Sequence, residues 1–239
     1  ERMRHAKMGN WYVENPQRSL ANNSICYTEK PDVGAFMREW SALYESRSGE
    51  RGIFNRQACK DMAPSRRDID HEFGTNPCSE IVLRSAQFCN LTEVVVRPED
   101  NLETLKVKVE AATILGTLQS ALTDFRFLRK VWKNNCEEER LLGMSLTGLW
   151  DRLDPLIEDD LCQLRTHAIN VNAKWAKRLK INPATAITCV KPSGTVSQLV
   201  NSASGCHPRH SRWYVRRVRN DIKDPLAKAM IDAGIPYEV

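Results

Sequence analysis

The sequence predicts an α/β fold whose strands run largely parallel. Short runs of branched apolar residues alternate with two long segments that carry apolar residues at helical spacing, as in strands connected by helices. No internal repeat, low-complexity tract or long linker divides the chain, so residues 1–239 are expected to form a single domain. At this level a closed barrel and an open sheet produce the same pattern.

The first part of the chain predicts a strand followed by a helix. Ser24–Tyr27 is expected to be a short strand, and Asp32, which follows Pro31, is expected to cap a helix that runs to Tyr44. The apolar positions of this helix are Val33, Phe36, Met37, Trp40 and Leu43. Residues 46–76 are polar and contain glycines, which predicts loops interrupted by a short helix near Asn55–Met62.

The next elements are two strands and a long helix. Strands are expected at Ile81–Leu83 and Glu93–Val96, on either side of Cys89. A helix is then expected to open at Asp100, with Glu103 as the partner in its capping box. The apolar stripe of this helix comprises Leu102, Leu105, Val109, Ala112, Leu115, Leu118 and Leu122.

The last elements repeat this alternation. A strand is expected at Leu142–Leu146, and a second long helix is expected to end near Asn182–Pro183. The apolar positions of that helix are Ile157, Leu161, Leu164, Ala168, Trp175 and Leu179. Thr185–Val190 is expected to be a strand that leads into the turn Pro192-Ser193-Gly194-Thr195.

Composition and charge exclude several classes of protein. With 41% hydrophobic and 27% charged residues, the chain is expected to fold around a core. No run of about 18 apolar residues appears, and the first residues, which lack an initiator Met, do not resemble a secretory signal. A cytoplasmic piece of a longer protein, without a membrane partner, is therefore expected. The net charge of +5 fits an anionic ligand, but an ordinary solvated surface explains it at least as well.

The cysteines and the basic C-terminal region do not indicate a metal site or a nucleic-acid site. None of the eight cysteines forms a C-x-x-C pair, and Cys206-His207-Pro208-Arg209-His210 reads as a polar loop, so no metal is expected. Basic residues with interleaved aromatics do bind phosphate backbones. Here a solvated or substrate-facing surface is favoured over a nucleic-acid patch for Arg209, Arg212, Trp213, Tyr214, Arg216, Arg217 and Arg219.

The most informative stretch is Asn76-Pro77-Cys78-Ser79-Glu80-Ile81. A cysteine within two residues of an amide and of a carboxylate fits radical or nucleophilic chemistry, although Asn-Pro also opens ordinary turns. A second cysteine, Cys89, follows eleven residues later in the sequence Phe88-Cys89-Asn90-Leu91. Taken alone, the first stretch would read as a turn.

A third segment, Pro192-Ser193-Gly194-Thr195-Val196-Ser197, lies between a predicted strand and polar helical sequence. Small and hydroxyl residues at such a turn offer backbone N–H groups and side-chain donors to a phosphate. The segment is no P-loop, since G-x-x-x-x-G-K is absent, and a simple connecting turn remains equally compatible with it.

Together these residues resemble the catalytic subunit of ribonucleotide reductase. In that family an Asn-Pro-Cys-x-Glu motif lies on a finger loop through the centre of a ten-stranded α/β barrel, and a Pro-Ser/Thr-x-Thr loop binds the substrate phosphates. The spacing to Cys89 is most similar to that of the adenosylcobalamin-dependent class. Further segments that resemble its monomeric members are Ala21–Ser24, Gly49–Arg56 and Glu139–Gly143.

The resemblance implies a role for each matched residue. Cys78 would carry a thiyl radical, Glu80 would act as general base, Asn76 would hold the sugar hydroxyls, and Cys89 would supply a proton and reducing electrons. The substrate phosphates would lie at the segment Pro192–Ser197, with Pro192, Ser193, Gly194, Thr195, Val196 and Ser197 as its members. Asn22, Asn23 and Ser24 would belong to a specificity segment. The cofactor would be adenosylcobalamin, and the partners a ribonucleotide and a thioredoxin- or glutaredoxin-like reductant.

Two alternatives remain open, and the resemblance is incomplete. The family's second reducing cysteine lies upstream of anything matched, and the family's C-terminal cysteine pair is missing. The remaining cysteines are interpreted as packing residues: Cys26, Cys59, Cys136, Cys162 and Cys189. The partial barrel is expected to be inactive and only marginally stable by itself. One alternative is a reductase subunit of class I type, which receives its radical from a separate subunit. The other is a nucleotide- or nucleic-acid-binding module without catalysis.

Overall fold

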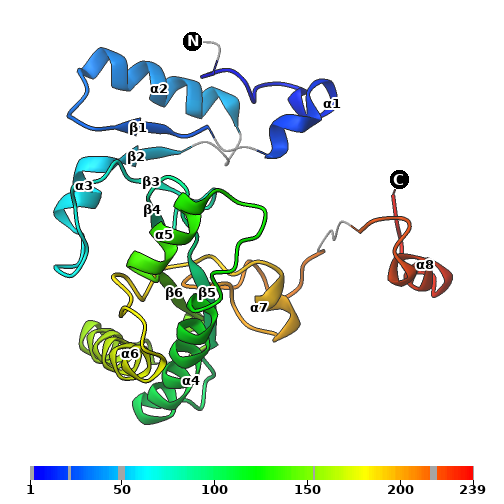
Figure 1. Cartoon of the computed structure of the whole chain (residues 1–239). Coiled ribbons are helices and arrows are strands. Elements are labelled where there is room, and N and C mark those ends of the chain that lie inside the picture. Colours follow the sequence, from blue (N-terminus) through cyan, green and yellow to red (C-terminus); the bar gives the residue numbers. More distant parts are fainter. Residues whose placement is uncertain (1–2, 21–22, 48–51, 153, 216–219, 239) are drawn as a thin grey trace. The chain divides into compact units, whose positions relative to one another are not determined.

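The computed structural model of the chain describes residues 3–20, 23–47, 52–152, 154–215 and 220–238 (Figure 1). The chain divides into two compact units, Glu1–Pro208 and Arg209–Val239, which are considered separately. Every residue predicted for the site lies in the first unit, apart from the C-terminal aromatic and basic residues. In the part of the chain that the structure describes, no helix is both long and apolar enough to cross a membrane.

The centre of the first unit is a pair of parallel strands. β5 (Asn90–Val95) pairs with β6 (Leu142–Thr147) in a register that sets Asn90 opposite Leu142 (Figure 1). On the other edge of β6, the chain near Thr188 runs parallel to it through a single bridge to Met144. The strand predicted at Thr185–Val190 therefore lies where a third strand belongs, although only one residue pair of it forms a bridge.

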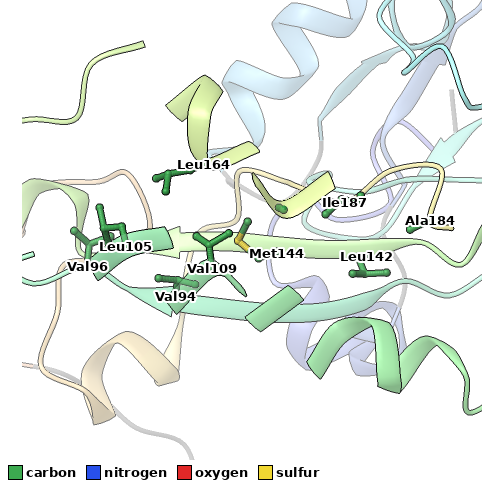
Figure 2. Packing of buried hydrophobic residues seen from close by; sticks show 10 residues of the cluster. Val94, Val96, Leu105, Val109, Leu142, Met144, Leu164, Ala184 and Ile187 are labelled. Atoms are coloured by element: carbon green, nitrogen blue, oxygen red, sulfur yellow. The ribbon is translucent and has the colours of Figure 1, made fainter. Parts of the chain in front are cut away.

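Two long helices cover these strands and enclose the core. α4 (Leu102–Ser120) and α6 (Glu158–Leu179) pack against each other, and α4 also packs on β5 and β6. Figure 2 shows the buried apolar side chains between them. The cluster comprises Val94, Val96, Leu105, Val109, Leu142, Met144, Leu164, Ala168, Ala184 and Ile187. Strands alternating with helices and a parallel pair confirm the α/β class predicted from the sequence.

The start of α4 differs from the prediction. Asn101, and not Asp100, caps the helix: its side chain accepts from Thr104 N, and Thr104 Oγ1 in turn accepts from Asn101 N. Glu103 has no part in this capping box and pairs with Lys106. Asp100 lies one residue earlier and accepts hydrogen bonds from Arg97 N and Lys108 Nζ. The prediction placed the cap one residue too early because Asp and Asn are equally good caps.

The buried stripe of α4 is also different in its second half. Leu115 is 61% exposed and Leu122 is 74% exposed, whereas Thr117 is completely buried. Asn172 of α6 donates a hydrogen bond to Thr117 Oγ1 and accepts one from Ala184 N, so a satisfied polar contact replaces the expected apolar one. Gly116 admits Leu142, whose side chain lies 3.1 Å from the position that a Cβ would take.

The first elements of the chain form a smaller parallel pair. β1 (Ile25–Tyr27) pairs with β2 (Ile53–Asn55), and α2 (Val33–Ser46) connects them with the predicted Asp32 cap, which accepts from Ala35 N. α3 (Arg56–Asp61) confirms the predicted short helix, and Asn55 caps it. Two short elements precede β1, namely α1 (Trp11–Glu14) and the 3-10 helix η1 (Pro16–Leu20).

Several elements were not predicted. α5 (Lys130–Glu139) is largely polar, and its anchor is a buried ion pair in which both guanidinium edge nitrogens of Arg67 donate to Glu139. The short 3-10 helix η2 (Leu149–Asp151) follows β6, whereas α7 (Thr195–Leu199) lies where polar helical sequence was expected. The second unit contains α8 (Pro225–Asp232). The strands described here form three two-stranded sheets, and these do not close into a barrel.

Candidate functional site

Cys78 lies in the loop of a β-hairpin. β3 (Gly74–Thr75) pairs antiparallel with β4 (Val82–Leu83), and residues 76–81, here called the Cys78 loop, connect them. A turn forms inside the loop, because Ser79 N donates to Asn76 O at 2.9 Å and Ser79 adopts a φ of 65°. Cys78 occupies an outer position of this turn, and its thiol is therefore exposed.

Asn76 stabilises the loop from inside. Its side-chain oxygen accepts a hydrogen bond from Ile81 N at 3.0 Å, while Asn76 N donates to Ile81 O. Ile81 itself is buried, and its Cδ1 lies 2.9 Å from the position that a Cβ on Gly143 of β6 would take. The absence of a side chain at Gly143 thus lets the Cys78 loop pack closely on the central strands.

Glu80 connects the Cys78 loop to the predicted phosphate segment. Lys191 Nζ donates to Glu80 Oε1 at 2.5 Å, across 111 residues of sequence. The Glu80 side chain is only 1% exposed and that of Lys191 is 23% exposed. The second oxygen, Glu80 Oε2, is buried and accepts no hydrogen bond from the described residues. A carboxylate in this state has a free acceptor position and a single cationic partner.

The pKa of Glu80 reflects these neighbours. Burial by itself would raise the pKa of this carboxyl. The hydrogen bond from Lys191 is the largest effect that offsets burial, the positive charge of Lys191 adds to it, and the pKa of Glu80 lies below its ordinary value. Glu80 is therefore ionised at neutral pH, as a general base must be.

Two further thiols lie near this ion pair. Burial and the negative charge of Glu80 raise the pKa of Cys89 to about 11. Burial, followed by the neighbouring Cys89 and Glu80, raises the pKa of Cys189 to about 12. Both groups are therefore protonated thiols at neutral pH. Cys189, expected to be a packing residue, is half-buried, and its sulfur lies 3.4 Å from the Cβ position of Gly143.

The other cysteines that were predicted to be packing residues differ from one another in burial. Cys136 is buried and its sulfur accepts a hydrogen bond from Phe88 N, as a packing residue would. Cys26 and Cys162 are exposed, so for them the prediction is wrong, because each lies on the outer face of its strand or helix.

The segment Pro192–Ser197 divides into buried and exposed positions. Ser193 and Ser197 are buried, and both hydroxyls are already hydrogen-bonded: Ser193 Oγ donates to Glu93 Oε1 of β5 and accepts from Ser197 N. Ser197 Oγ donates to Gly194 O at 2.7 Å. The exposed positions are Pro192, Gly194, Thr195 and Val196, and a Cβ added to Gly194 would meet no atom within 4 Å. Open space therefore lies beside Gly194 and Thr195, where a ligand has room.

The remaining predicted residues do not join this site. Asn22 lies outside the described residues, Asn23 donates to Met3 O, and Ser24 Oγ accepts from Gly52 N, which links the starts of β1 and β2. Among the described residues no group of three or more His, Cys, Asp or Glu side chains is placed to hold a metal ion. Arg216, Arg217 and Arg219 also lie outside the described part of the chain.

Sequence reasoning missed Lys191 and Glu93. Lys191 directly precedes Pro192 in the phosphate segment, and Glu93 is on β5, four residues after Cys89. Their positions next to motif residues were a usable signal. Their partners, Glu80 and Ser193, are about 100 residues away in sequence and become visible only in the fold.

Comparisons with known proteins agree on one group of relatives. No protein-family model matches the chain. A protein of Dictyostelium discoideum named a probable adenosylcobalamin-dependent ribonucleoside-triphosphate reductase is 28% identical over 241 residues, which cover 95% of this chain and 31% of that protein. The adenosylcobalamin-dependent ribonucleoside-triphosphate reductase of Lactobacillus leichmannii is 27% identical over 262 residues, which cover 92% of this chain and 34% of that enzyme.

A solved structure gives the same result. A crystal structure of a B12-dependent (class II) ribonucleotide reductase matches with a TM-score of 0.58 and 23% identity, covering 82% of this chain and 32% of that chain. The chain spans about a third of the length of the curated relatives that it matches. These matches confirm the resemblance that the motifs indicated, over nearly all of the chain.

Proposed function

We propose that this chain is part of the catalytic subunit of an adenosylcobalamin-dependent ribonucleotide reductase, the family that it matches over nearly its whole length. The observation that supports this most is the Lys191–Glu80 hydrogen bond. It joins the loop of Cys78 to the segment Pro192–Ser197, so the two motifs predicted to act on one substrate lie side by side. A substrate whose phosphates lie against the 192–197 segment can then reach Cys78 and Glu80 with its sugar.

The cofactor of this reaction would be adenosylcobalamin, as the names of the relatives indicate. An exposed Cys78 thiol at the outer side of a turn fits a group that approaches from outside the loop. When bound, adenosylcobalamin supplies the radical that removes the hydrogen atom from the Cys78 thiol. A class I enzyme with a separate radical-generating subunit is less well supported, since the relatives described above are of the cobalamin-dependent class.

The residues of the Cys78 loop would open the reaction. The Cys78 sulfur, as a thiyl radical, would take the 3′ hydrogen of the ribose and later return it. Glu80 would accept the proton of the 3′-hydroxyl, and its free Oε2 is the atom available for it. Asn76 would orient the sugar hydroxyls through its amide, while its oxygen keeps the loop in shape.

Cys89 would complete the reduction. Because its pKa is raised to about 11, it holds a proton that it can donate to the departing 2′-hydroxyl. Water leaves, and oxidation of Cys89 together with a second thiol to a disulfide supplies the two electrons that reduce the sugar. A thioredoxin- or glutaredoxin-like dithiol would then reduce the disulfide for the next turnover.

The substrate would be a ribonucleotide held by its phosphates at the 192–197 segment. Backbone N–H groups near Gly194 and the Thr195 hydroxyl would make the contacts, because the Ser193 and Ser197 hydroxyls already donate to Glu93 and to Gly194 O. Triphosphates are the favoured substrates, since the relatives are named ribonucleoside-triphosphate reductases. In the complete enzyme β5, β6 and the chain near Thr188 would be neighbouring strands of a ten-stranded barrel, with residues 1–239 within one catalytic domain.

The test is product formation by the full-length protein. Ribonucleoside triphosphates, adenosylcobalamin and a dithiol are incubated with it, and deoxyribonucleotides are quantified by chromatography. Product that requires adenosylcobalamin is expected. Product without cobalamin, after addition of a second subunit, would favour the class I alternative. Nucleotide binding without any product would favour the non-catalytic binding module.

A further inference from the structure

Lys191 and Glu80 form a contact between two different parts of the proposed site. Glu80 belongs to the Cys78 loop, and Lys191 lies immediately before Pro192 at the start of the 192–197 segment. A strong charge-assisted hydrogen bond joins them, and the lysine side chain is the more exposed partner. The contact therefore pairs the proposed general base with the lysine that directly precedes the proposed phosphate segment.

We propose that Lys191 is a positioning residue that exchanges its ion pair with Glu80 for one with the substrate phosphates, so that phosphate binding releases Glu80 to act as a base. This inference rests on the proposed function and extends it. It assigns to Lys191 a role in sensing a phosphorylated substrate. A nucleoside without phosphates would leave the ion pair intact, and the negative charge of Glu80 would stay paired with Lys191.

The geometry permits such an exchange. The backbone at Lys191 is held in place, because Gly205, with a φ of 56°, approaches so closely that a Cβ there would lie 2.5 Å from Lys191 O. The long lysine side chain pivots on this fixed backbone. In this structure it reaches Glu80, and open space lies next to Gly194, three residues further along the chain. Phosphate oxygens carry more negative charge than one carboxylate, which favours the transfer.

The charged surroundings of Glu80 determine how its pKa changes in the exchange. The acidic and thiol groups near the pair are Cys78 of the loop, Cys89 and Glu93 of the β5 region, and Cys189 beside Lys191. Lys191 is the cation that lowers the pKa of Glu80. Without that cation the effect of burial is offset less, and the pKa of Glu80 rises. A base whose pKa moves upward towards neutral pH accepts a hydroxyl proton more readily.

The sign of the linked proton change is set by these two states of Glu80. In the free protein the pKa of Glu80 lies below its ordinary value of 4.5, and in the phosphate complex it lies higher. Between these two values, binding of a phosphate causes Glu80 to take up a proton. Above both values Glu80 is ionised in either state and contributes no proton uptake.

The experiment measures proton uptake on binding of inorganic tripolyphosphate to the full-length protein. Calorimetric titrations in two buffers of different ionisation enthalpy, at pH values from 4.5 upward, give the number of protons taken up. The variants are Lys191→Met, Lys191→Arg and Glu80→Gln. Lys174→Met, an exposed position on α6, is the matched control.

The expected results separate Glu80→Gln and Lys191→Met from the wild type. The wild type takes up more protons than Glu80→Gln, which binds tripolyphosphate several-fold more tightly because Lys191 no longer has a competing partner. Lys191→Met binds roughly tenfold more weakly and loses the Glu80-linked uptake, since one charge-assisted hydrogen bond is lost. Lys191→Arg keeps both properties, and Lys174→Met behaves as the wild type does.

Three results would overturn the proposal. The first is equal proton uptake in the wild type and Glu80→Gln at every pH titrated. The others are undiminished affinity in Lys191→Met and no binding of tripolyphosphate by the wild type. Formation of deoxyribonucleotide is measured in parallel on the wild type. Proton uptake linked to Glu80 without deoxyribonucleotide would contradict the reductase function but not the exchange of the Lys191 ion pair. Deoxyribonucleotide without this proton uptake would contradict the ion-pair exchange alone.

Discussion

Cys89 provides the first prediction at the scale of single residues. The substitution Cys89→Ser is expected to stop repeated turnover with a dithiol reductant, because the disulfide cannot form. Cleavage of the radical-generating cofactor is expected to continue. In the wild type, turnover should also fall as the pH approaches about 11, where Cys89 loses its proton. Both are measured by product formation and by cobalamin absorbance. Normal cycling by Cys89→Ser would show that its spacing from Cys78 has no functional meaning.

The 192–197 segment provides a second prediction. Gly194→Val is expected to weaken nucleotide binding strongly, since a branched side chain would fill the open space beside Gly194. Ser193→Ala is expected to cost about 1 kcal/mol, because it removes a hydrogen bond that supports the segment and not one to the ligand. The measurement is nucleotide affinity of both variants in the full-length protein. Near-native affinity for Gly194→Val would mean that this turn only connects two elements.

At the scale of elements, the start of α4 allows a direct test of the cap. Asn101→Ala is expected to lower the free energy of unfolding by about 1 kcal/mol, since it removes the acceptor for Thr104 N. Glu103→Ala is the matched control, because Glu103 is largely exposed and takes no part in the capping box. Chemical denaturation followed by circular dichroism measures both. A larger loss for Glu103→Ala would restore the cap assignment that the sequence favoured.

The elements also show how far the sequence predicts the fold. Helix α2, its Asp32 cap, α3 and strand β6 follow from local patterns, and the structure has them close to where they were expected. α5 was missed because its burial depends on Arg67, more than 60 residues away. The inner face of α4 was predicted as a stripe of leucines, but Thr117 and Asn172 satisfy each other there. Local periodicity cannot reveal polar pairs between helices.

At the scale of the whole molecule, the candidate site was predicted in parts and not as a unit. The motifs identified Cys78, Glu80 and the 192–197 segment separately, from residue types and spacing. Lys191, which joins them, was overlooked because its partner is 111 residues away. Only the pairing of β5, β6 and the chain near Thr188 brings these segments together. Long-range packing thus decides which of the matched residues meet.

The 239-residue chain by itself is expected to be inactive and only marginally stable. Its described sheets have two strands each, and beyond the bridge between Met144 and Thr188 their edges carry no further strand among the described residues. Large apolar side chains such as Trp40 and Tyr44 are exposed on α2. Hydrogen exchange should show protection concentrated in β5, β6, α4 and α6, with rapid exchange elsewhere. Uniform protection in a soluble monomer at high concentration would contradict this expectation.

We propose that Cys78 exchanges a hydrogen atom with the ribose of a bound nucleotide. The most direct measurement compares turnover of an ordinary ribonucleoside triphosphate with that of one deuterated at the 3′ carbon, in the full-length wild type and in Cys78→Ser. We expect slower turnover of the deuterated substrate, a product that still carries deuterium, and no product from Cys78→Ser despite intact nucleotide binding. Ordinary deoxyribonucleotide formation by Cys78→Ser would contradict it.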